Sequence, residues 1–295
     1  MSVIATEGAV TAIIETPRGV YAETDRGTLR LSQGACEGGI CTTPDVIRAL
    51  PEPTPEGALP DGKIATASEG KVRAAWFGQP TERYQHCVLG DCIEAGSLHV
   101  QLQDGSMLEH VLPADQVFED ITPRLFDLDG DGSSEIVTIR ASNSGGGAVV
   151  IYALRDGALV ELATSSENGR PNRWLNIAQI SAGQILFVRT PHIGGRLAVL
   201  QIDASGAVRE ENDVVTGMSN HVIGSRELDL QETVDLGGQS VLVIPSQSRD
   251  SLRLISGNQA IGAIALPARI DRAIASVGNL LVTATEDGRL LAIEP

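Results

Sequence analysis

The chain has 295 residues, and its 38 acidic and 22 basic side chains give a formal charge of −16. Such a charge repels phosphate backbones and anionic lipid headgroups, which argues against nucleic-acid and membrane partners. No apolar run reaches the roughly 20 residues of a membrane-spanning helix, and a hydrophobic content of 42% is too high for a disordered chain. We therefore expect a soluble protein of one large or two ordinary domains.

The composition favours β-structure. Glycine occurs 32 times, and aromatic residues make up only 3% of the chain. That mixture is typical of short strands joined by tight turns. Short runs rich in Val, Ile and Leu predict strands; they cover residues 97–103, 135–140, 148–154, 184–189, 196–203, 240–244 and 279–284. Asp-Gly pairs predict hairpin turns; they stand at 104–105, 156–157 and 287–288.

One helix is predicted, in the first fifth of the chain. Thr43 can cap it, Pro44 suits the first helical position, and the segment extends to Leu50. Several prolines then predict an extended connector; they are Pro51, Pro53, Pro55 and Pro60. Residues 42–61 are thus expected to join two repeating units.

An internal repeat organises the chain. The sequences 36–41 and 87–92 share the pattern C-x-x-G-x-C, and their offset is 87 − 36 = 51 residues. Residues 12–19 fall on residues 63–70 at the same offset. Further groups of predicted strands open at similar intervals; they begin near Leu125, Trp174, Leu228 and Ile274. The chain is therefore divided into about six units of roughly 50 residues, a period typical of propeller blades.

The predicted fold is a single all-β domain, residues 1–295, forming a β-propeller of about six four-stranded blades. A closed ring lets each blade bury both faces against its neighbours and leaves few sheet edges exposed. A seventh blade could lie within residues 95–122. A two-domain β-sandwich would also give short strands at close intervals, but the 51-residue period favours the ring.

The four cysteines allow three readings. Cys36 with Cys41 and Cys87 with Cys92 can close two local disulfides in an exported protein. They can also be free thiols, or can bind one zinc ion together. Residues 1–10 contain no secretion signal. With disulfides the protein is expected to be periplasmic or secreted, its signal removed; with free thiols it would be cytoplasmic.

A run of acidic residues between 127 and 135 predicts a metal site. Carboxylates at alternate positions, with Gly130 and Gly132 for a tight bend, place hard oxygen ligands around one point, which suits calcium. The expected ligands are the side chains of Asp127, Asp129, Asp131 and Glu135 and the carbonyl of Ser133. An EF-hand would need an acid at the twelfth position, which is Thr138, and a following helix. The sequence instead predicts a calcium loop that opens a strand.

Residues 126–137, with the glycine turn 145–147 and the strand 148–153, resemble an FG-GAP or VCBS-type repeat. The resemblance covers about residues 121–155, and the loops near Ile180 and Val234 lack the acid series. The family usually has Asp at the ninth position, where this chain has Glu135. The resemblance implies a calcium-stabilised propeller of the integrin-like type. Members serve mostly in adhesion, recognition or scaffolding, and some accompany enzymes.

Two later segments combine arginines with Pro or Gly turns and are candidate ligand loops. Their residues of interest are Arg170, Arg173, Trp174, Arg189, His192 and Arg196. Guanidinium groups in such loops can hold an anion or a carboxylate-rich partner. The alternative is that both segments are solvated loops on a blade rim.

The expected function is a non-enzymatic, calcium-binding propeller outside the cytoplasm that binds or scaffolds a protein or glycan partner. The alternative is a polysaccharide lyase or hydrolase with its site in the central funnel. No catalytic group of residues is visible in the sequence, and few aromatic side chains are available to stack on sugar rings. The non-enzymatic reading is therefore preferred.

Overall fold

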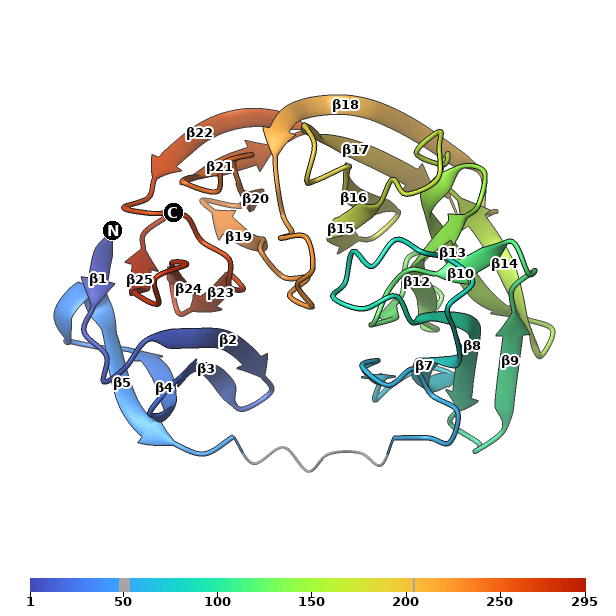
Figure 1. The fold of residues 1–295 in the computed structure, drawn as a ribbon, viewed down its shortest axis with the longest axis horizontal. Helices are drawn as coiled ribbons and strands as arrows, with labels where there is room; N and C mark the ends of the chain where they lie inside the picture. Colours follow the sequence, from blue (N-terminus) through green and yellow to red (C-terminus); the bar gives the residue numbers. More distant parts are fainter. Residues whose placement is uncertain (48–53, 204) are drawn as a thin grey trace.

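The computed structural model describes residues 1–47, 54–203 and 205–295. In this part of the chain there are 25 β-strands and one short 3-10 helix, η1 (Glu37–Gly39). The strands form antiparallel sheets arranged as blades around a central axis (Figure 1). The predicted all-β propeller is confirmed, and the described strands make six blades.

Each of the first three blades is an antiparallel meander whose first strand is innermost. Blade 1 contains β2 (Val10–Thr16), β3 (Gly19–Thr24), β4 (Gly27–Gln33) and β5 (Ile40–Asp45). Blade 2 contains β6 (Ala65–Thr66), β7 (Val72–Thr81), β8 (Glu94–Leu102) and β9 (Met107–Val111). Blade 3 contains β10 (Gln116–Phe118), β11 (Arg124–Phe126), β12 (Glu135–Ser142), β13 (Gly146–Arg155) and β14 (Ala158–Thr164).

The other three blades follow the same order. Blade 4 contains β15 (Leu175–Ser181), β16 (Gln184–Arg189), β17 (Gly195–Ile202) and β18 (Val208–Met218). Blade 5 contains β19 (Glu232–Leu236), β20 (Gln239–Pro245), β21 (Ser251–Ser256) and β22 (Gln259–Ala265). Blade 6 contains β23 (Ala275–Val277), β24 (Leu280–Ala284), β25 (Leu290–Ile293) and β1 (Ser2–Ile4).

Blade 6 closes the ring. Its outermost strand is β1, which pairs antiparallel with β25 and brings the two ends of the chain into one sheet (Figure 1). Buried side chains of blades 6 and 1 form one apolar cluster, which includes Ile4, Ile13 and Leu290. Similar clusters fill the spaces between other neighbouring blades. The core therefore lies between blades, as expected for sheets that bury both faces.

The innermost strand of blade 3 is broken between β10 and β11. Both pieces pair with β12, and between them the Asp120 carboxylate accepts a hydrogen bond from Ile139 N at 3.2 Å. Asp120 is fully buried and forms an ion pair with Arg124 at 2.6 Å. A side-chain carboxylate thus replaces a backbone carbonyl in the ladder. Phe118 of β10 also pairs with Ala95 of β8, so blades 2 and 3 share one sheet.

Two sequence predictions are corrected by the fold. Thr43 and Pro44 lie in β5, so no helix begins there; β5 pairs along β4 as an outermost strand, where proline is tolerated. The end of the predicted helix and the start of the proline connector lie outside the described residues. The alternative of a seventh blade within residues 95–122 is wrong, because these residues supply β8, β9 and β10.

Of the two sequence matches that define the 51-residue repeat, only one falls on equivalent positions of two blades. Residues 12–19 and 63–70 both lead from the first strand of a blade into its second. The two cysteine pairs, however, occupy different connections: Cys36–Cys41 lies between β4 and β5, and Cys87–Cys92 lies between β7 and β8. A long β7–β8 loop shifts the later strands of blade 2, so the matched cysteine spacing is not a structural equivalence.

The ring has two distinct faces. In blades 1 to 5, turns from the first strand to the second, and from the third to the fourth, lie on one side, which we call the turn face; it includes residues 127–134 and 156–157. Among the described residues of these blades, the connections from the second strand to the third lie on the opposite side, the loop face, as do the connections that lead onward from blades 2, 3 and 4. The loop face includes residues 82–93 and 219–231. On the loop face these two loops meet, since Gly224 N donates to Val88 O at 2.8 Å.

The junction of blades 2 and 3 buries two carboxyl groups. Phe118 and Ala95 are register partners, which places Glu119 opposite Glu94 in the antiparallel ladder. Glu94 is 2% exposed and Glu119 is fully buried. Burial, and then the charges of Glu119 and Asp61, raise the pKa of Glu94 to about 9. Glu94 therefore carries a proton at neutral pH.

Replacing Ile4 by Ala tests the ring closure. Ile4 is 5% exposed in β1, whereas its neighbour Val3 is 44% exposed. We expect Ile4→Ala to lower the free energy of unfolding by about 3 kcal/mol, and Val3→Ala to change it by less than about 0.5 kcal/mol. Urea unfolding measures both. Equal effects of the two variants would contradict the packing of β1 against blade 1.

Replacing Glu94 by Gln tests the buried carboxyl. The folded state keeps a proton that the unfolded chain releases near its ordinary pKa of 4.5. The free energy of unfolding therefore falls as the pH rises from 4.5 towards 9, and is greatest below 4.5. Glutamine imitates the protonated acid, so Glu94→Gln should raise the melting temperature at pH values near 8 and have little effect near 4.5. The exposed Glu82→Gln is the control, and parallel pH curves for Glu94→Gln and wild type would contradict the assignment.

Candidate functional site

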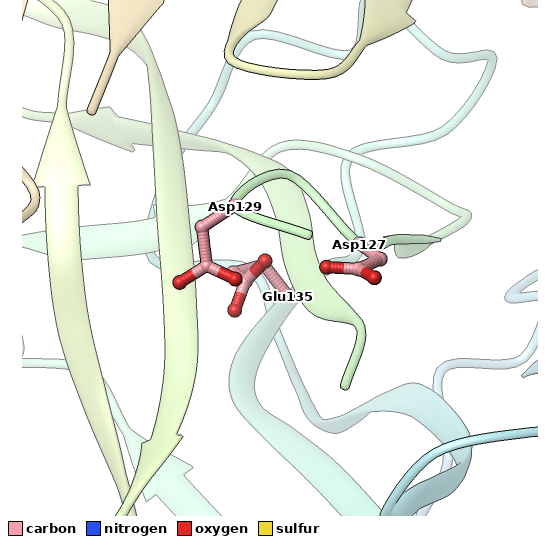
Figure 2. A group of neighbouring side chains, drawn as sticks. All are labelled: Asp127, Asp129 and Glu135. Atoms are coloured by element: carbon pink, nitrogen blue, oxygen red, sulfur yellow. The ribbon is translucent and has the colours of Figure 1, made fainter. Parts of the chain in front are cut away.

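The acidic loop joins β11 to β12 on the turn face of blade 3. Carboxylate oxygens of Asp127, Asp129 and Glu135 lie within 4.8 Å of one another. Figure 2 shows the Asp129 and Glu135 carboxylates side by side, with that of Asp127 directed towards them from the other arm of the loop. Glu135 is only 1% exposed, and burial followed by the charges of Asp129 and Asp131 raises its pKa. Three such groups repel one another and form a set of hard oxygen donors.

The loop curls around the Asp127 carboxylate. Its Oδ1 accepts hydrogen bonds from Gly130 N at 2.8 Å and Asp131 N at 3.1 Å, and its Oδ2 accepts one from Gly132 N at 3.0 Å. Gly130 and Gly132 have φ angles of 75° and 83°, in the left-handed region that favours glycine. The predicted glycine bend is therefore formed. Because an oxygen has two acceptor sites, Asp127 Oδ2 keeps one for a further ligand.

Asp131 and Ser133 lie in the same turn but apart from the three-carboxylate group. The Asp131 side chain is 47% exposed, accepts a hydrogen bond from Ser133 N at 2.7 Å, and faces Arg155 at 3.8 Å. Arg155 also lies 3.2 Å from Asp129 Oδ2. The Arg155 guanidinium therefore neutralises part of the loop's charge from the neighbouring end of β13.

The acidic loop touches the turns of both adjacent blades. Gly183 N, in the β15–β16 turn of blade 4, donates to Leu128 O at 2.9 Å. On the other side, a Cβ added to Gly70 of blade 2 would stand 2.6 Å from Gly132 O. Gly70 is thus required by close approach as well as by its φ of 77°. A group bound in the loop would therefore act at a joint of three blades.

All four cysteines are paired as disulfides. Cys36 pairs with Cys41, with Cα atoms 5.2 Å apart, and Cys87 pairs with Cys92, with Cα atoms 4.2 Å apart. The first pair lies on the turn face and the second on the loop face. The disulfide reading is confirmed, and the free-thiol and four-cysteine zinc readings do not apply to this structure.

The two predicted ligand loops come together on the loop face. Arg170 and Arg173, from the connection between β14 and β15, and Arg196, at the start of β17, line one cavity of about 390 Å³. The other lining residues lie in the β14–β15 and β16–β17 connections; they are Asn168, Thr190, Ile193 and Gly194. Three guanidinium groups of the six candidate residues therefore face a common space.

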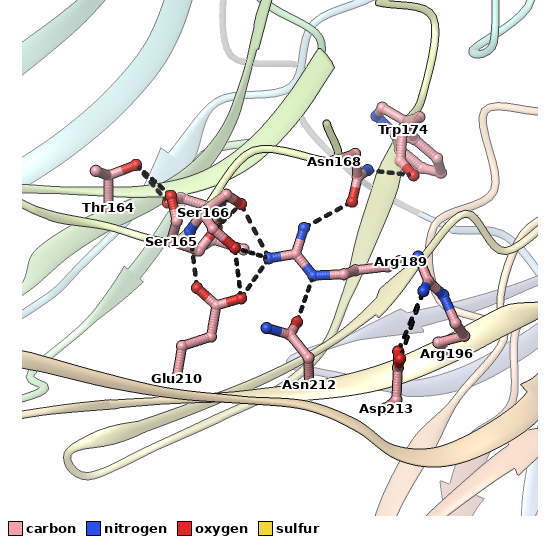
Figure 3. A network of polar contacts seen from close by, with 11 residues as sticks. Thr164, Ser165, Ser166, Asn168, Trp174, Arg189, Arg196, Glu210, Asn212 and Asp213 are labelled. Carbon is pink, nitrogen blue, oxygen red and sulfur yellow. Dashed lines mark hydrogen bonds and ion pairs between the residues drawn. The ribbon is translucent and has the colours of Figure 1, made fainter. Parts of the chain in front are cut away.

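Arg189 does not belong to that space, contrary to the expectation for it. Its side chain is buried and donates to Asn212 Oδ1 at 2.8 Å and to Asn168 Oδ1 at 2.7 Å (Figure 3). It also pairs with Glu210 and donates to the Ser166 carbonyl at 2.9 Å. With each guanidinium nitrogen bonded within the protein, Arg189 braces the β14–β15 connection against β18 instead of binding a ligand.

Trp174 and His192 are also structural. Trp174 is 2% exposed, and its Nε1 donates to Glu119 O at 2.9 Å. The His192 ring stacks on the Trp174 ring, and His192 Nε2 lies 2.8 Å from His221 Nδ1. Burial lowers the pKa of His192 to about 4 and that of His221 to about 3. Both imidazoles are neutral at pH 7, so neither supplies positive charge to an anion.

One pair on the loop face, a half-buried histidine on a buried glutamate, has no signal in the sequence. His86 Nδ1 contacts Glu119 Oε1, and Glu119 Oε2 is buried with no hydrogen-bond partner in the described part of the chain. Tyr84, beside His86, accepts a hydrogen bond from Asn172 N at 2.9 Å. The pair joins the β7–β8 loop to the break between β10 and β11. No periodicity or spacing in the sequence signals such a contact between irregular segments.

Acidic side chains also line a cavity of about 400 Å³ between the innermost strands and the loop face. They are Glu15, Glu227, Asp229 and Glu232, together with Lys63. Burial, and then the charges of Glu15 and Asp229, raise the pKa of Glu232 to about 7. Within the described residues, no hydrogen bond links two of these carboxyl groups. Glu232 is therefore the group of this set that titrates near neutral pH.

Among the described residues, none belongs to a helix long and apolar enough to cross a membrane.

No family model and no curated protein sequence matches the chain. Solved structures with a similar arrangement share little sequence with it. Sqt1 of Saccharomyces cerevisiae is 15% identical with a TM-score of 0.45, covering 81% of this chain, which spans 61% of the length of Sqt1. The AfRom2 CNH domain is 9% identical with a TM-score of 0.47, and the match covers 99% and 88% of the two chains. BBS1N, solved in complex with ARL6DN, is 11% identical with a TM-score of 0.44, over 98% and 79%.

Proposed function

We propose that this chain is a calcium-stabilised binding or scaffold propeller that works outside the cytoplasm and presents its loop face to a protein or glycan partner. The observation that supports the proposal most is the convergence of Asp127, Asp129 and Glu135 within 4.8 Å at a joint of three blades. Such a position suits an ion with a structural role.

The donor set fits calcium. Asp127, Asp129 and Glu135 supply hard carboxylate oxygens, which calcium prefers and which soft transition metals do not. Asp131 and the Ser133 carbonyl lie in the same turn and would complete the ligand set, and Arg155 would give up its contact with Asp129 to the cation. The ion would supply charge neutralisation, and these residues would hold it against blades 2 and 4.

The disulfides support a place outside the cytoplasm. Disulfides persist in oxidising compartments and are rare where glutathione keeps thiols reduced. Both cysteine pairs of this chain are closed. Extracellular calcium modules also work with modest affinities, of about 10⁻⁴ to 10⁻³ M, which a partly preformed loop can reach. The proposed cofactor and the proposed compartment are therefore consistent.

A second candidate function is favoured by the acidic cavity at the centre of the ring. Glu232, with a pKa of about 7, can act as a general acid or base on a polysaccharide that reaches the funnel. In that case Glu232→Gln should abolish the release of reducing ends from a panel of polysaccharides, while the exposed Glu109→Gln keeps it. If wild-type protein releases none, this candidate falls and the binding proposal stands.

A thermal melt in calcium and in chelator tests the proposed ion. At free calcium of about 100 times the dissociation constant, binding should stabilise the folded state by about 2.7 kcal/mol, so the melting temperature rises in calcium and falls in chelator. Asp129→Ala should melt at the chelated temperature under both conditions, because it removes one of the three converging carboxylates.

Asp115→Ala is the matched control, since Asp115 is an exposed aspartate of the same blade without a side-chain hydrogen bond among the described residues. This variant should keep the full calcium response. A wild-type melting temperature that does not change between calcium and chelator would remove the ion from the account.

A further inference from the structure

The cavity lined by Arg170, Arg173 and Arg196 is a local exception to the charge of the chain. The whole protein carries −16, yet in the described part of the chain no ion pair involves Arg170 or Arg173. Arg173 Nη1 donates only to the neutral carbonyl of Asn172, at 3.0 Å. Arg196 faces Asp213 at 3.5 Å, with both side chains nearly half exposed. Such an exposed pair is weak, so the cavity keeps most of its positive charge.

Hydrogen bonds beneath the cavity fix the backbone that lines it. Asn168 accepts from buried Arg189 and donates to Arg173 O at 3.0 Å and to Trp174 O at 2.9 Å. Figure 3 shows this chain of contacts running from Glu210 through Arg189 to Asn168 and Trp174. The backbone that carries Arg170 and Arg173 is thus fixed by hydrogen bonds that start from the buried Arg189 guanidinium. Preorganisation of this kind lowers the entropy cost of binding.

Two residues beside the cavity have left-handed backbone conformations. Thr190 has a φ of 49° and Asn172 a φ of 55°. The left-handed region is unfavourable for a β-branched residue such as Thr, and strain of this kind tends to persist at functional sites. The Thr190 N–H donates to Trp174 O at 2.9 Å, while its hydroxyl has no hydrogen-bond partner among the described residues. That hydroxyl is available to a ligand.

The lining selects one class of ligand. Guanidinium groups bind carboxylates and sulfates through two parallel hydrogen bonds. A volume of about 390 Å³ lies within the range of small-ligand pockets. The only large apolar side chain in the lining is Ile193, which is 59% exposed, and no aromatic residue lines it. An acidic peptide would find little to hold its apolar side chains, whereas the hydroxyls of a sugar can pair with Thr190 and the loop backbone.

We propose that Arg170, Arg173 and Arg196 form a binding site for the acidic groups, carboxylate or sulfate, of a polysaccharide. The inference rests on the proposed binding function and names the ligand class of its loop face. Arg189 acts as a positioning residue, because it holds Asn168 and does not face the cavity.

Binding of the full chain to four polymers tests the site. Polygalacturonate carries carboxylates, heparin carries sulfates, dextran is neutral, and polyglutamate is an acidic peptide. We expect wild-type protein to bind polygalacturonate or heparin but not dextran, with an affinity that falls as salt is raised from about 0.05 M to about 0.5 M. The double variant Arg170→Ala/Arg196→Ala should bind at least about tenfold more weakly, because two charged contacts are lost.

The matched control is Arg26→Ala/Arg209→Ala, which removes two exposed arginines away from the cavity and gives the same net charge. It should bind like wild type, and both double variants should keep the wild-type melting temperature and calcium response.

Unchanged binding by the Arg170→Ala/Arg196→Ala variant, or equal loss in the control, would overturn the site. Binding of dextran alone would overturn the site but leave a glycan-binding function, and binding of polyglutamate alone would assign the site to a protein. No binding to any polymer would also overturn it, while a calcium-dependent melt would still support the proposed scaffold.

Discussion

Electrostatic repulsion among three neighbouring carboxylates is the central constraint on the acidic loop of blade 3. Asp127, Asp129 and Glu135 are held within 4.8 Å by the loop's own backbone, and Glu135 is buried. The Arg155 guanidinium neutralises only part of the negative charge of the loop. The loop also contacts turns of the blades on either side. In a ring that is held together by contacts between blades, an ion at this position would stabilise several interfaces at once.

The two faces of the ring carry different functional groups. The turn face carries short hairpins and the acidic loop. The acidic loop interacts with neighbouring turns of the same protein. The loop face carries the longer connections, the Cys87–Cys92 disulfide, the His86–Glu119 pair and the arginine cavity. A rigid sheet scaffold that presents variable loops on one side is a common basis for recognition. The buried brace around Arg189 links the two roles, because a strand residue fixes the loop that carries Arg170 and Arg173.

Much of the architecture could be predicted from the sequence, because short strands and a 50-residue period are local properties. The helix at Thr43 was wrong because pairing along β4 overrides a capping signal of two residues. The shared cysteine spacing suggested equivalent positions, yet the long β7–β8 loop moved one pair to the other face. Of the six loop residues, Arg170, Arg173 and Arg196 line the cavity, while Arg189, Trp174 and His192 are occupied within the protein. Burial of an arginine or a histidine is a tertiary property, so no local pattern separates the two groups.

The most direct test of the central claim is a crystal structure of protein grown in calcium, with the anomalous signal of the ion measured. If the acidic loop binds calcium, one peak is expected on the turn face of blade 3, about 2.3 to 2.6 Å from oxygens of Asp127, Asp129 and Glu135, with Arg155 displaced from Asp129. A loop without a peak, and with Arg155 still paired to Asp129 at saturating calcium, would contradict it.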